Sequence, residues 1–227
     1  MLAASSPYFR TTFSSDFQEG ISAHITLHDI SPWIMKRIIE YVYTGHLEIT
    51  LEKAQDYLRT GHMLEYHDIV DACCTLLKNN LHPANCLGIK EFACMFSCTD
   101  LEEKAFHFAL ENFMLVIERS EEFYELPLQS LLVYLTSDEI EISAELLVWK
   151  AIKRWISHEP DHRRQFLCEL FSTLRLSTID TQDLQQLKCD GFLTSHPSLL
   201  KTIESCLQTY PSTTNTHLVS HILFSQP

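Results

Sequence analysis

Apolar residues recur at helical spacing along most of the chain, most clearly between residues 83 and 118. Leu87 and Phe92 predict one helix in this stretch, and the apolar positions of residues 101–116 predict a second helix packed against it. Pro83 suits the first position of the first helix, because its missing N–H would have no partner there in any case. The pattern therefore predicts an α-helical hairpin, and nothing in it indicates catalytic chemistry.

Capping residues predict where other helices begin and end. Thr99 or Asp100 is expected to cap the second helix of the hairpin. Nearer the N-terminus, Ser31 is expected to cap a helix that starts at Pro32 and ends at Gly45. Helices of this kind fill most of the sequence, and the 227 residues include only five glycines. Together these features favour a mainly α-helical protein.

One segment has the period of a strand instead. Apolar and polar residues alternate from Ile21 to Leu27, which predicts a half-buried β-strand. After residue 126 the helical period returns, and Ser143 is expected to cap a helix that contains Glu145, close to the helix N-terminus, and Trp155. From residue 210 the composition shifts to Ser, Thr, Asn and His, so residues 210–227 are expected to be mostly disordered.

The charge and hydropathy of the chain exclude several kinds of partner. A net charge of −13 argues against nucleic acid and against an anionic membrane surface. No apolar run reaches the length of a membrane span, and the N-terminus lacks the pattern of a secretory signal. We therefore expect no nucleic-acid partner, no membrane partner, and a location in the cytoplasm or also in the nucleus.

Eight cysteines raise the alternative of metal or redox chemistry. Their spacing includes no C-x-x-C pair and indicates no disulfide framework, so reduced thiols are expected. A zinc site would need four ligands to converge from separate helices, whereas buried free cysteines need no ligand set. We predict no metal and no cofactor. The residues that could supply a zinc site are Cys94, Cys98, His62, His67, Cys73, Cys74 and His82.

Two separate blocks of sequence resemble the Kelch-like (BTB–Kelch) family. The block after residue 81 resembles a BACK domain, and the block before residue 46 resembles the second half of a BTB (POZ) domain. The BACK-like residues are His82-Pro83-Ala84-Asn85-Cys86-Leu87-Gly88-Ile89, Leu110-Glu111-Asn112-Phe113, Glu122-Phe123, Leu126-Pro127, Ser137-Asp138, Glu145, Trp155 and Arg175-Leu176. The BTB-like residues are Leu2-Ala3-Ala4-Ser5-Ser6-Pro7-Tyr8-Phe9-Arg10, Ile25-Thr26-Leu27-His28-Asp29-Ile30 and Tyr41-Val42-Tyr43-Thr44-Gly45.

The resemblance implies a mainly α fold, in which a partial BTB (POZ) α+β domain is followed by an all-helical BACK domain. Residues 1–80 would form the BTB part without its N-terminal helix and strands, residues 81–209 the BACK domain, and residues 210–227 a loose tail. The Gly-Gly repeat of a kelch propeller is not found in the sequence, so the chain is expected to be a truncated isoform or a fragment. Because family dimers rest largely on the N-terminal elements, a weak homodimer or none is expected.

The resemblance also implies a surface for cullin-3. Phe17 and Glu19 match a hydrophobic-x-Glu motif that inserts into a cullin-3 groove in Kelch-like proteins, and Glu40 and Tyr43 lie where BTB adaptors meet the same partner. An exposed apolar side chain can anchor an interface, and a carboxylate can accept a charged hydrogen bond. The alternatives are a solvated acidic loop around residue 17 and an ordinary helix end at residue 43. The helices of residues 83–118 match the family's three-box, which extends the cullin surface.

The function implied is that of a non-catalytic substrate adaptor, or a truncated form of one, in a cullin-3 RING E3 ubiquitin ligase. One alternative is a BTB-type interaction module that titrates or hetero-oligomerises with full-length BTB proteins without ligase activity. Another is a metal- or redox-sensing protein that uses the cysteines. Cullin binding separates the first two, and zinc content distinguishes a metal sensor.

Overall fold

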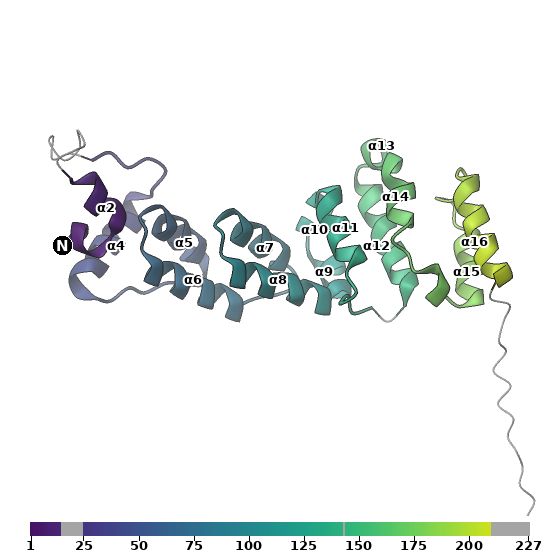
Figure 1. Cartoon of the computed structure of the whole chain (residues 1–227), viewed down its shortest axis with the longest axis horizontal. Coiled ribbons are helices and arrows are strands. Elements are labelled where there is room, and N and C mark those ends of the chain that lie inside the picture. Colours follow the sequence, from purple (N-terminus) through teal and green to yellow (C-terminus); the bar gives the residue numbers. More distant parts are fainter. Residues whose placement is uncertain (15–24, 143, 210–227) are drawn as a thin grey trace, which may run out of the picture. The chain divides into compact units, whose positions relative to one another are not determined.

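The computed structural model describes residues 1–14, 25–142 and 144–209, and every regular element in these ranges is a helix (Figure 1). The mainly α fold class predicted from the sequence is confirmed. Residues 21–24 of the predicted strand lie outside the described residues, and residues 25–27 adopt neither helix nor strand, so the strand stays a prediction. None of the described helices is long and apolar enough to cross a membrane.

The chain divides into two compact units, Met1–Glu125 and Leu126–Pro227. The helices of the first unit are α1 (Leu2–Ser5), α2 (Pro7–Thr12), α4 (Pro32–Thr44), the 3-10 helix η1 (Leu51–Lys53), α5 (Ala54–Met63), α6 (His67–Asn79), α7 (Cys86–Met95), α8 (Thr99–Glu111), α9 (Phe113–Arg119) and α10 (Glu122–Glu125).

Two helical hairpins, α5 with α6 and α7 with α8, are the most closely packed helix pairs described in the first unit (Figure 1). Each hairpin turns through one residue in the left-handed region, Glu65 with φ 57° and Ser97 with φ 55°. Backbone hydrogen bonds close both turns, from Tyr66 N to Gly61 O at 2.8 Å and from Cys98 N to Ala93 O at 2.9 Å. The hairpin predicted for residues 83–118 is therefore present.

Some helix ends differ from the sequence prediction. Pro83 is not the first residue of α7, because residues 83–85 form a turn and the helix begins at Cys86. Neither Thr99 nor Asp100 caps α8, since the residue before the helix is Cys98 and the Asp100 carboxylate pairs with Lys78 of α6. The Asp100 side chain, which the local pattern assigned to a helix cap, thus forms an ion pair with another helix.

The N-terminal helices and α4 follow their local signals more closely. Ser6 precedes α2, and its buried hydroxyl accepts a hydrogen bond from Phe9 N and donates one to Leu64 O at 2.6 Å. Helix α4 begins at Pro32 as predicted, although Ser31 makes no side-chain cap. Gly45 ends α4 with φ 71°, a conformation that glycine adopts without steric cost.

The second unit contains α11 (Leu128–Thr136), α12 (Glu145–His158), α13 (Pro160–Arg163), η2 (Arg164–Phe166), α14 (Leu167–Phe171), η3 (Leu176–Thr178), α15 (Thr181–Lys188) and α16 (Pro197–Thr209). Ser143, the predicted cap of α12, lies outside the described residues, and Ala144 precedes the helix. Glu145 does begin α12, but its carboxylate accepts a hydrogen bond from Arg175 N at 2.9 Å. The predicted tail also lies outside the described residues.

Candidate functional site

The structure describes two of the four residues that the sequence assigned to a cullin surface. Phe17 and Glu19 lie outside the described residues. Glu40 and Tyr43 lie three positions apart on α4, so they are neighbours on the surface of that helix. Their role in binding stays a prediction.

Helix α4 buries one side and exposes the other, because its apolar positions follow the helical period. Ile34 and Ile38 are buried in the core of the first unit, whereas Tyr43 is 63% exposed and Trp33 is 52% exposed. Glu40 is half-buried and pairs with Arg37 at 2.9 Å. We call Trp33, Glu40 and Tyr43 the α4 stripe.

Trp33 is the member of the stripe that sequence reasoning missed. It directly follows the helix-initiating proline and lies outside the residues that carry the family resemblance. Its ring lies 6.2 Å from that of buried Tyr57, and half of its surface faces solvent. The signal that could have found it is its spacing of seven from Glu40, which places both on one helix face.

A groove of about 420 Å³ lies where the start of α2, the end of α4 and the α5–α6 turn meet. Tyr41 and Val42 line it from α4, and Glu65 and Asp68 add two carboxylates at its edge. Tyr66 also lines the groove, and its hydroxyl is hydrogen-bonded to Ser5 Oγ at 3.1 Å. Burial raises the pKa of Tyr66 above its ordinary value, so this wall is a neutral phenol at physiological pH. We call this the Tyr41–Tyr66 groove.

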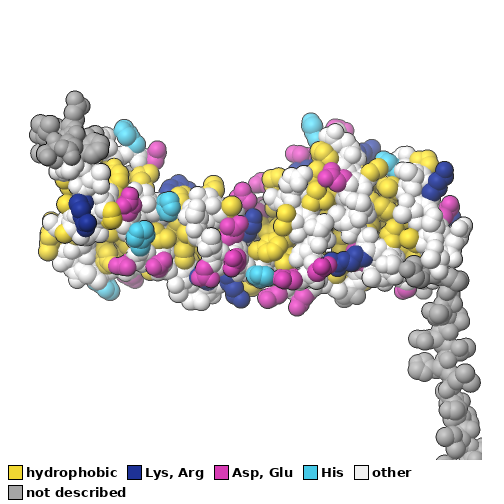
Figure 2. Space-filling view, viewed as in Figure 1, with side chains coloured by type: hydrophobic (Ala, Val, Ile, Leu, Met, Phe, Trp, Pro, Cys, Tyr) yellow, Lys and Arg dark blue, Asp and Glu magenta, His cyan; other side chains and the backbone are white. Residues whose placement is uncertain are grey.

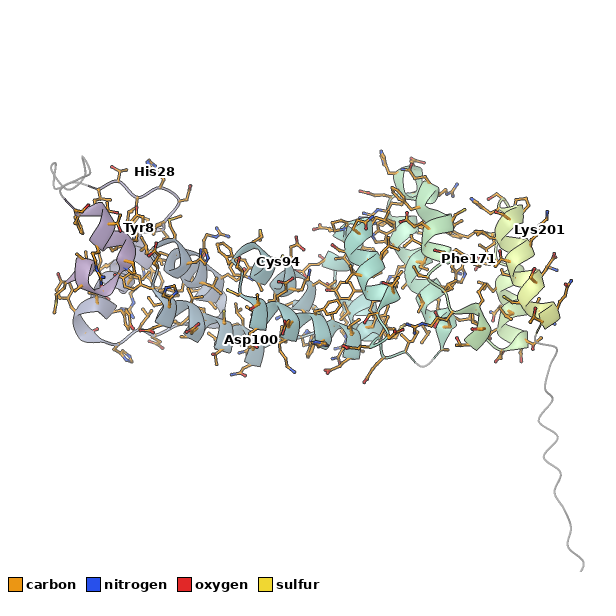
Figure 3. All side chains as sticks on the ribbon, in the orientation of Figure 1. Tyr8, His28, Cys94, Asp100, Phe171 and Lys201 are labelled. Atoms are coloured by element: carbon orange, nitrogen blue, oxygen red, sulfur yellow. The ribbon has the colours of Figure 1, made fainter. Side chains whose placement is uncertain are left out.

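The cysteines show no metal-binding arrangement. Across residues 1–14, 25–142 and 144–209, no three His, Cys, Asp or Glu side chains are grouped so that they could hold an ion. Four of the residues considered for zinc, His62, His67, Cys74 and Cys98, do line a second groove of about 550 Å³ between α6 and the start of α8. Figure 3 places Cys94 and Asp100 on different edges of the α7–α8 hairpin, so Cys94 does not join this group.

Acidic side chains are more prominent than basic ones on the face in Figure 2, in keeping with the net charge of −13. The exposed face of α4 itself carries two aromatic side chains, Trp33 and Tyr43, together with exposed Lys36 and the Arg37–Glu40 ion pair. Aromatic residues on such a surface are suited to contact another protein, because they bury a large area at low cost in rotamer entropy.

Comparison with known proteins finds matches in the same two parts of the chain that resemble BTB and BACK domains. Residues 1–81 match the family described as BTB/POZ domain, and residues 86–188 match the family described as BTB And C-terminal Kelch. Kelch-like proteins that are 33–36% identical to the chain match more than four fifths of it, so the chain belongs to the Kelch-like family. Helices α1 to α6 lie in the BTB match, and the BACK match begins at α7, inside the first compact unit. The predicted boundary at residue 80 stays a prediction.

Three relatives illustrate the Kelch-like membership. Kelch-like protein 2 of Homo sapiens is 36% identical over 186 residues, which are 82% of this chain and 31% of the relative. Human Kelch-like protein 17 is 33% identical over 198 residues, with 87% of this chain and 31% of the relative covered. Human Kelch-like protein 30 is 35% identical over 206 residues, which are 91% of this chain and 34% of the relative. The chain therefore spans about a third of the length of these relatives. Proteins of the family are generally cullin-3 adaptors, and BTB domains generally form dimers.

Proposed function

We propose that this chain is a non-catalytic adaptor that binds cullin-3 through its BTB part, in the cytoplasm or also in the nucleus. The observation that carries the proposal is the α4 stripe, which exposes Trp33 and Tyr43 on a helix of the BTB match. Large aromatic side chains of this kind often supply most of the binding energy of an interface. Glu40, held by Arg37, would contribute a charge at the rim.

Residues 17–19, which lie outside the described residues, would supply the second half of the contact. In this proposal Phe17 inserts as an apolar anchor and Glu19 accepts a charged hydrogen bond, as the family motif implies. The Tyr41–Tyr66 groove lies at the start of helix α2 and offers a neutral aromatic wall beside two carboxylates. The α7–α8 hairpin, the three-box of the resemblance, would extend the surface.

Titration of the whole chain against the N-terminal domain of cullin-3 tests the proposal. We expect the double substitution Phe17→Ala and Glu19→Ala to weaken binding by about 1–3 kcal/mol, and Tyr43→Ala by about 1–2 kcal/mol. Val133→Ala is the matched control, because Val133 is 54% exposed but lies in the second unit. Unchanged affinity in both the Tyr43 variant and the Phe17/Glu19 double variant, or no binding by the parent chain, would overturn the proposal.

A second candidate is a BTB interaction module that hetero-oligomerises with other BTB proteins and is itself a weak homodimer or none. It is favoured by apolar side chains that the N-terminal helices leave open, Met1 at 74% and Phe13 at 41% exposure. Light scattering of the chain alone and mixed with a full-length BTB protein tests it. A tight homodimer at micromolar concentration, or no mixed species, would contradict this candidate.

A further inference from the structure

Two cysteines from different helical hairpins meet in the second groove. Cys74 lies on α6, one turn before Lys78, and Cys98 lies two residues before Asp100, at the start of α8. The Lys78 ammonium and the Asp100 carboxylate pair with each other across the two helices. Cys74 and Cys98 therefore face each other between α6 and α8, next to this ion pair. Both line the groove of about 550 Å³.

The two thiols differ in environment. Cys74 is 9% exposed, and burial raises the pKa of its thiol to about 12, with the neighbouring Cys98 thiol adding to the effect. Cys98 is half-buried and lies on non-helical backbone directly after Ser97, the left-handed residue of the turn. A small oxidant entering from solvent therefore meets Cys98 first, whereas Cys74 is held behind it in its protonated form.

We propose that Cys74 and Cys98 are a dithiol pair that a hydroperoxide converts to a reversible disulfide. In the first step the Cys98 sulfur attacks the peroxide, its S–H becomes S–OH, and one water leaves when hydrogen peroxide is the oxidant. In the second step the Cys74 sulfur attacks the sulfenic sulfur, the S–O bond breaks, and the thiol proton leaves with the hydroxyl as a second water. The peroxide is reduced and the two thiols are oxidised by two electrons in total.

A disulfide needs an S–S separation of roughly 2 Å. The Cys98 backbone is held by hydrogen bonds from its N–H to Ala93 O and from Glu102 N to its carbonyl oxygen, so the sulfurs would approach by rotation of the two side chains. The new bond would tie residue 74, in the BTB match, to residue 98, in the BACK match. It would fasten the α5–α6 hairpin to the α7–α8 hairpin, whichever partner the protein binds.

Neighbouring cysteines provide the alternatives that the test must separate. Cys73 is fully buried and does not line the groove, and the pKa of its thiol is raised to about 12 by burial, with the Cys98 thiol adding to the effect. Cys73 is therefore the main competitor of Cys74 as the partner of Cys98. Cys94 is exposed, and Cys86 is buried in the first turn of α7. Buried cysteines that serve only as small apolar side chains would show no selective pairing.

The test is peptide mapping by mass spectrometry after the whole reduced chain has been treated with a few equivalents of hydrogen peroxide. We expect a major species that has lost two hydrogens, carries a crosslink between the peptides of Cys74 and Cys98, and returns to the starting mass with dithiothreitol. Slower hydrogen exchange at the end of α6 and the start of α8 should accompany it. A dominant crosslink through Cys73 or Cys94, or overoxidation without any crosslink, would overturn the proposal.

Three cysteine variants test the order of the two steps. Cys98→Ser should abolish the crosslink and the mass change at Cys74, because the attacking group at the surface is gone. Cys74→Ala should leave a Cys98 sulfenic acid that dimedone traps, and Cys94→Ser is the matched control that should still form the crosslink. Because Cys74 is buried, circular dichroism must show each variant folded. If Cys74→Ala does not fold, the crosslink map of the parent chain decides alone.

Discussion

The two compact units differ in what their charged side chains contact. In the first unit, apolar hairpins pack against each other, and carboxylates reach across them: Asp100 pairs with Lys78, and Glu122 accepts a hydrogen bond from Gly88 N. In the second unit, charged side chains also contact the indole groups of buried tryptophans. Arg163 lies over the Trp155 ring at 4.2 Å, and Asp190 binds both Trp149 and Lys153.

This difference between the two units predicts where substitutions should be tolerated. A surface that binds partners can expose aromatic side chains only if its own helices do not depend on them. The α4 stripe fits this condition, because Ile34 and Ile38 anchor the opposite side of the helix. In the second unit the large aromatic residues are themselves the points at which helices meet, so substitutions there should cost more.

The largest expected effect comes from Trp155→Ala. Trp155 is 2% exposed, its Nε1 donates to Leu126 O at 2.9 Å, and Arg163 Nη1 donates to its carbonyl oxygen at 3.1 Å. Loss of the ring leaves a cavity and removes the surface on which the Arg163 guanidinium stacks, so the free energy of unfolding should fall by about 3–5 kcal/mol. Urea denaturation followed by circular dichroism measures this.

Trp33→Ala in the first unit is the control for that comparison. Because Trp33 is 52% exposed, its replacement should lower the free energy of unfolding by less than about 1.5 kcal/mol. Equal losses for the two tryptophans would mean that the units do not differ as described.

The next largest effect is expected for Asp190→Asn. The carboxylate of Asp190 accepts hydrogen bonds from Trp149 Nε1 at 3.0 Å and Lys153 Nζ at 2.6 Å, and its side chain is only 17% exposed. The substitution removes the charge opposite Lys153, which should cost about 1–3 kcal/mol in a thermal or urea melt. Asp138→Asn, whose side chain is 99% exposed although it pairs with Arg175, should cost under about 0.5 kcal/mol.

The pH dependence of stability tests the role of the Asp190 charge. Burial alone would raise the pKa of Asp190, but its hydrogen bonds to Lys153, to Phe192 N and to Trp149 outweigh burial and lower it. A carboxyl whose pKa is lower in the folded state contributes stability above its unfolded pKa and loses it as the pH falls through the folded value. The difference in melting temperature between parent and Asp190→Asn should therefore be constant near neutrality and shrink below about pH 4. A difference that grows on acidification would refute this assignment.

The smallest effect is expected for Gly61→Ala in the first unit. Glycine inside helix α5 would ordinarily be a cost, and alanine would gain up to about 1 kcal/mol in helix propensity. Here the added Cβ would lie 3.3 Å from Val70 Cγ2 of α6, closer than a comfortable contact. The two terms oppose each other, so we expect a change within about 1 kcal/mol by urea denaturation. Gly191→Ala, with open space around the added methyl, is the control.

The helical period of the sequence predicted most of this fold, and the motif residues predicted its family. Periodicity found the α7–α8 hairpin and α4 because these signals are local. It failed for Asp100, whose carboxylate pairs with Lys78 of α6 and does not cap α8. Glu145 does begin α12 as expected, and its additional hydrogen bond with Arg175 N could not be read from the local pattern. The Tyr41–Tyr66 groove was missed for the same reason, since three separate segments form it.

The candidate site likewise contains residues that local signals identify and features that depend on tertiary packing. Tyr43 could be placed on an exposed helix end from motif and spacing, and it does lie on exposed surface there. The exposure of Trp33 and the meeting of Cys74 with Cys98 depend on how hairpins pack, which no local pattern encodes. The role of Phe17, Glu19, Glu40 and Tyr43 in binding is a matter for the titrations proposed above.

The Ser6 hydroxyl has a consequence for how the chain is made. Its hydrogen bond to Leu64 O joins residues that are 58 positions apart in the sequence. Such a contact raises the contact order of the first unit and delays its closure, because the intervening chain must be ordered first. During synthesis on a ribosome, α2 therefore cannot complete its docking until the α5–α6 turn has left the exit tunnel. The apolar faces of the N-terminal helices stay open for that interval, which is when a chaperone would be most useful to this protein.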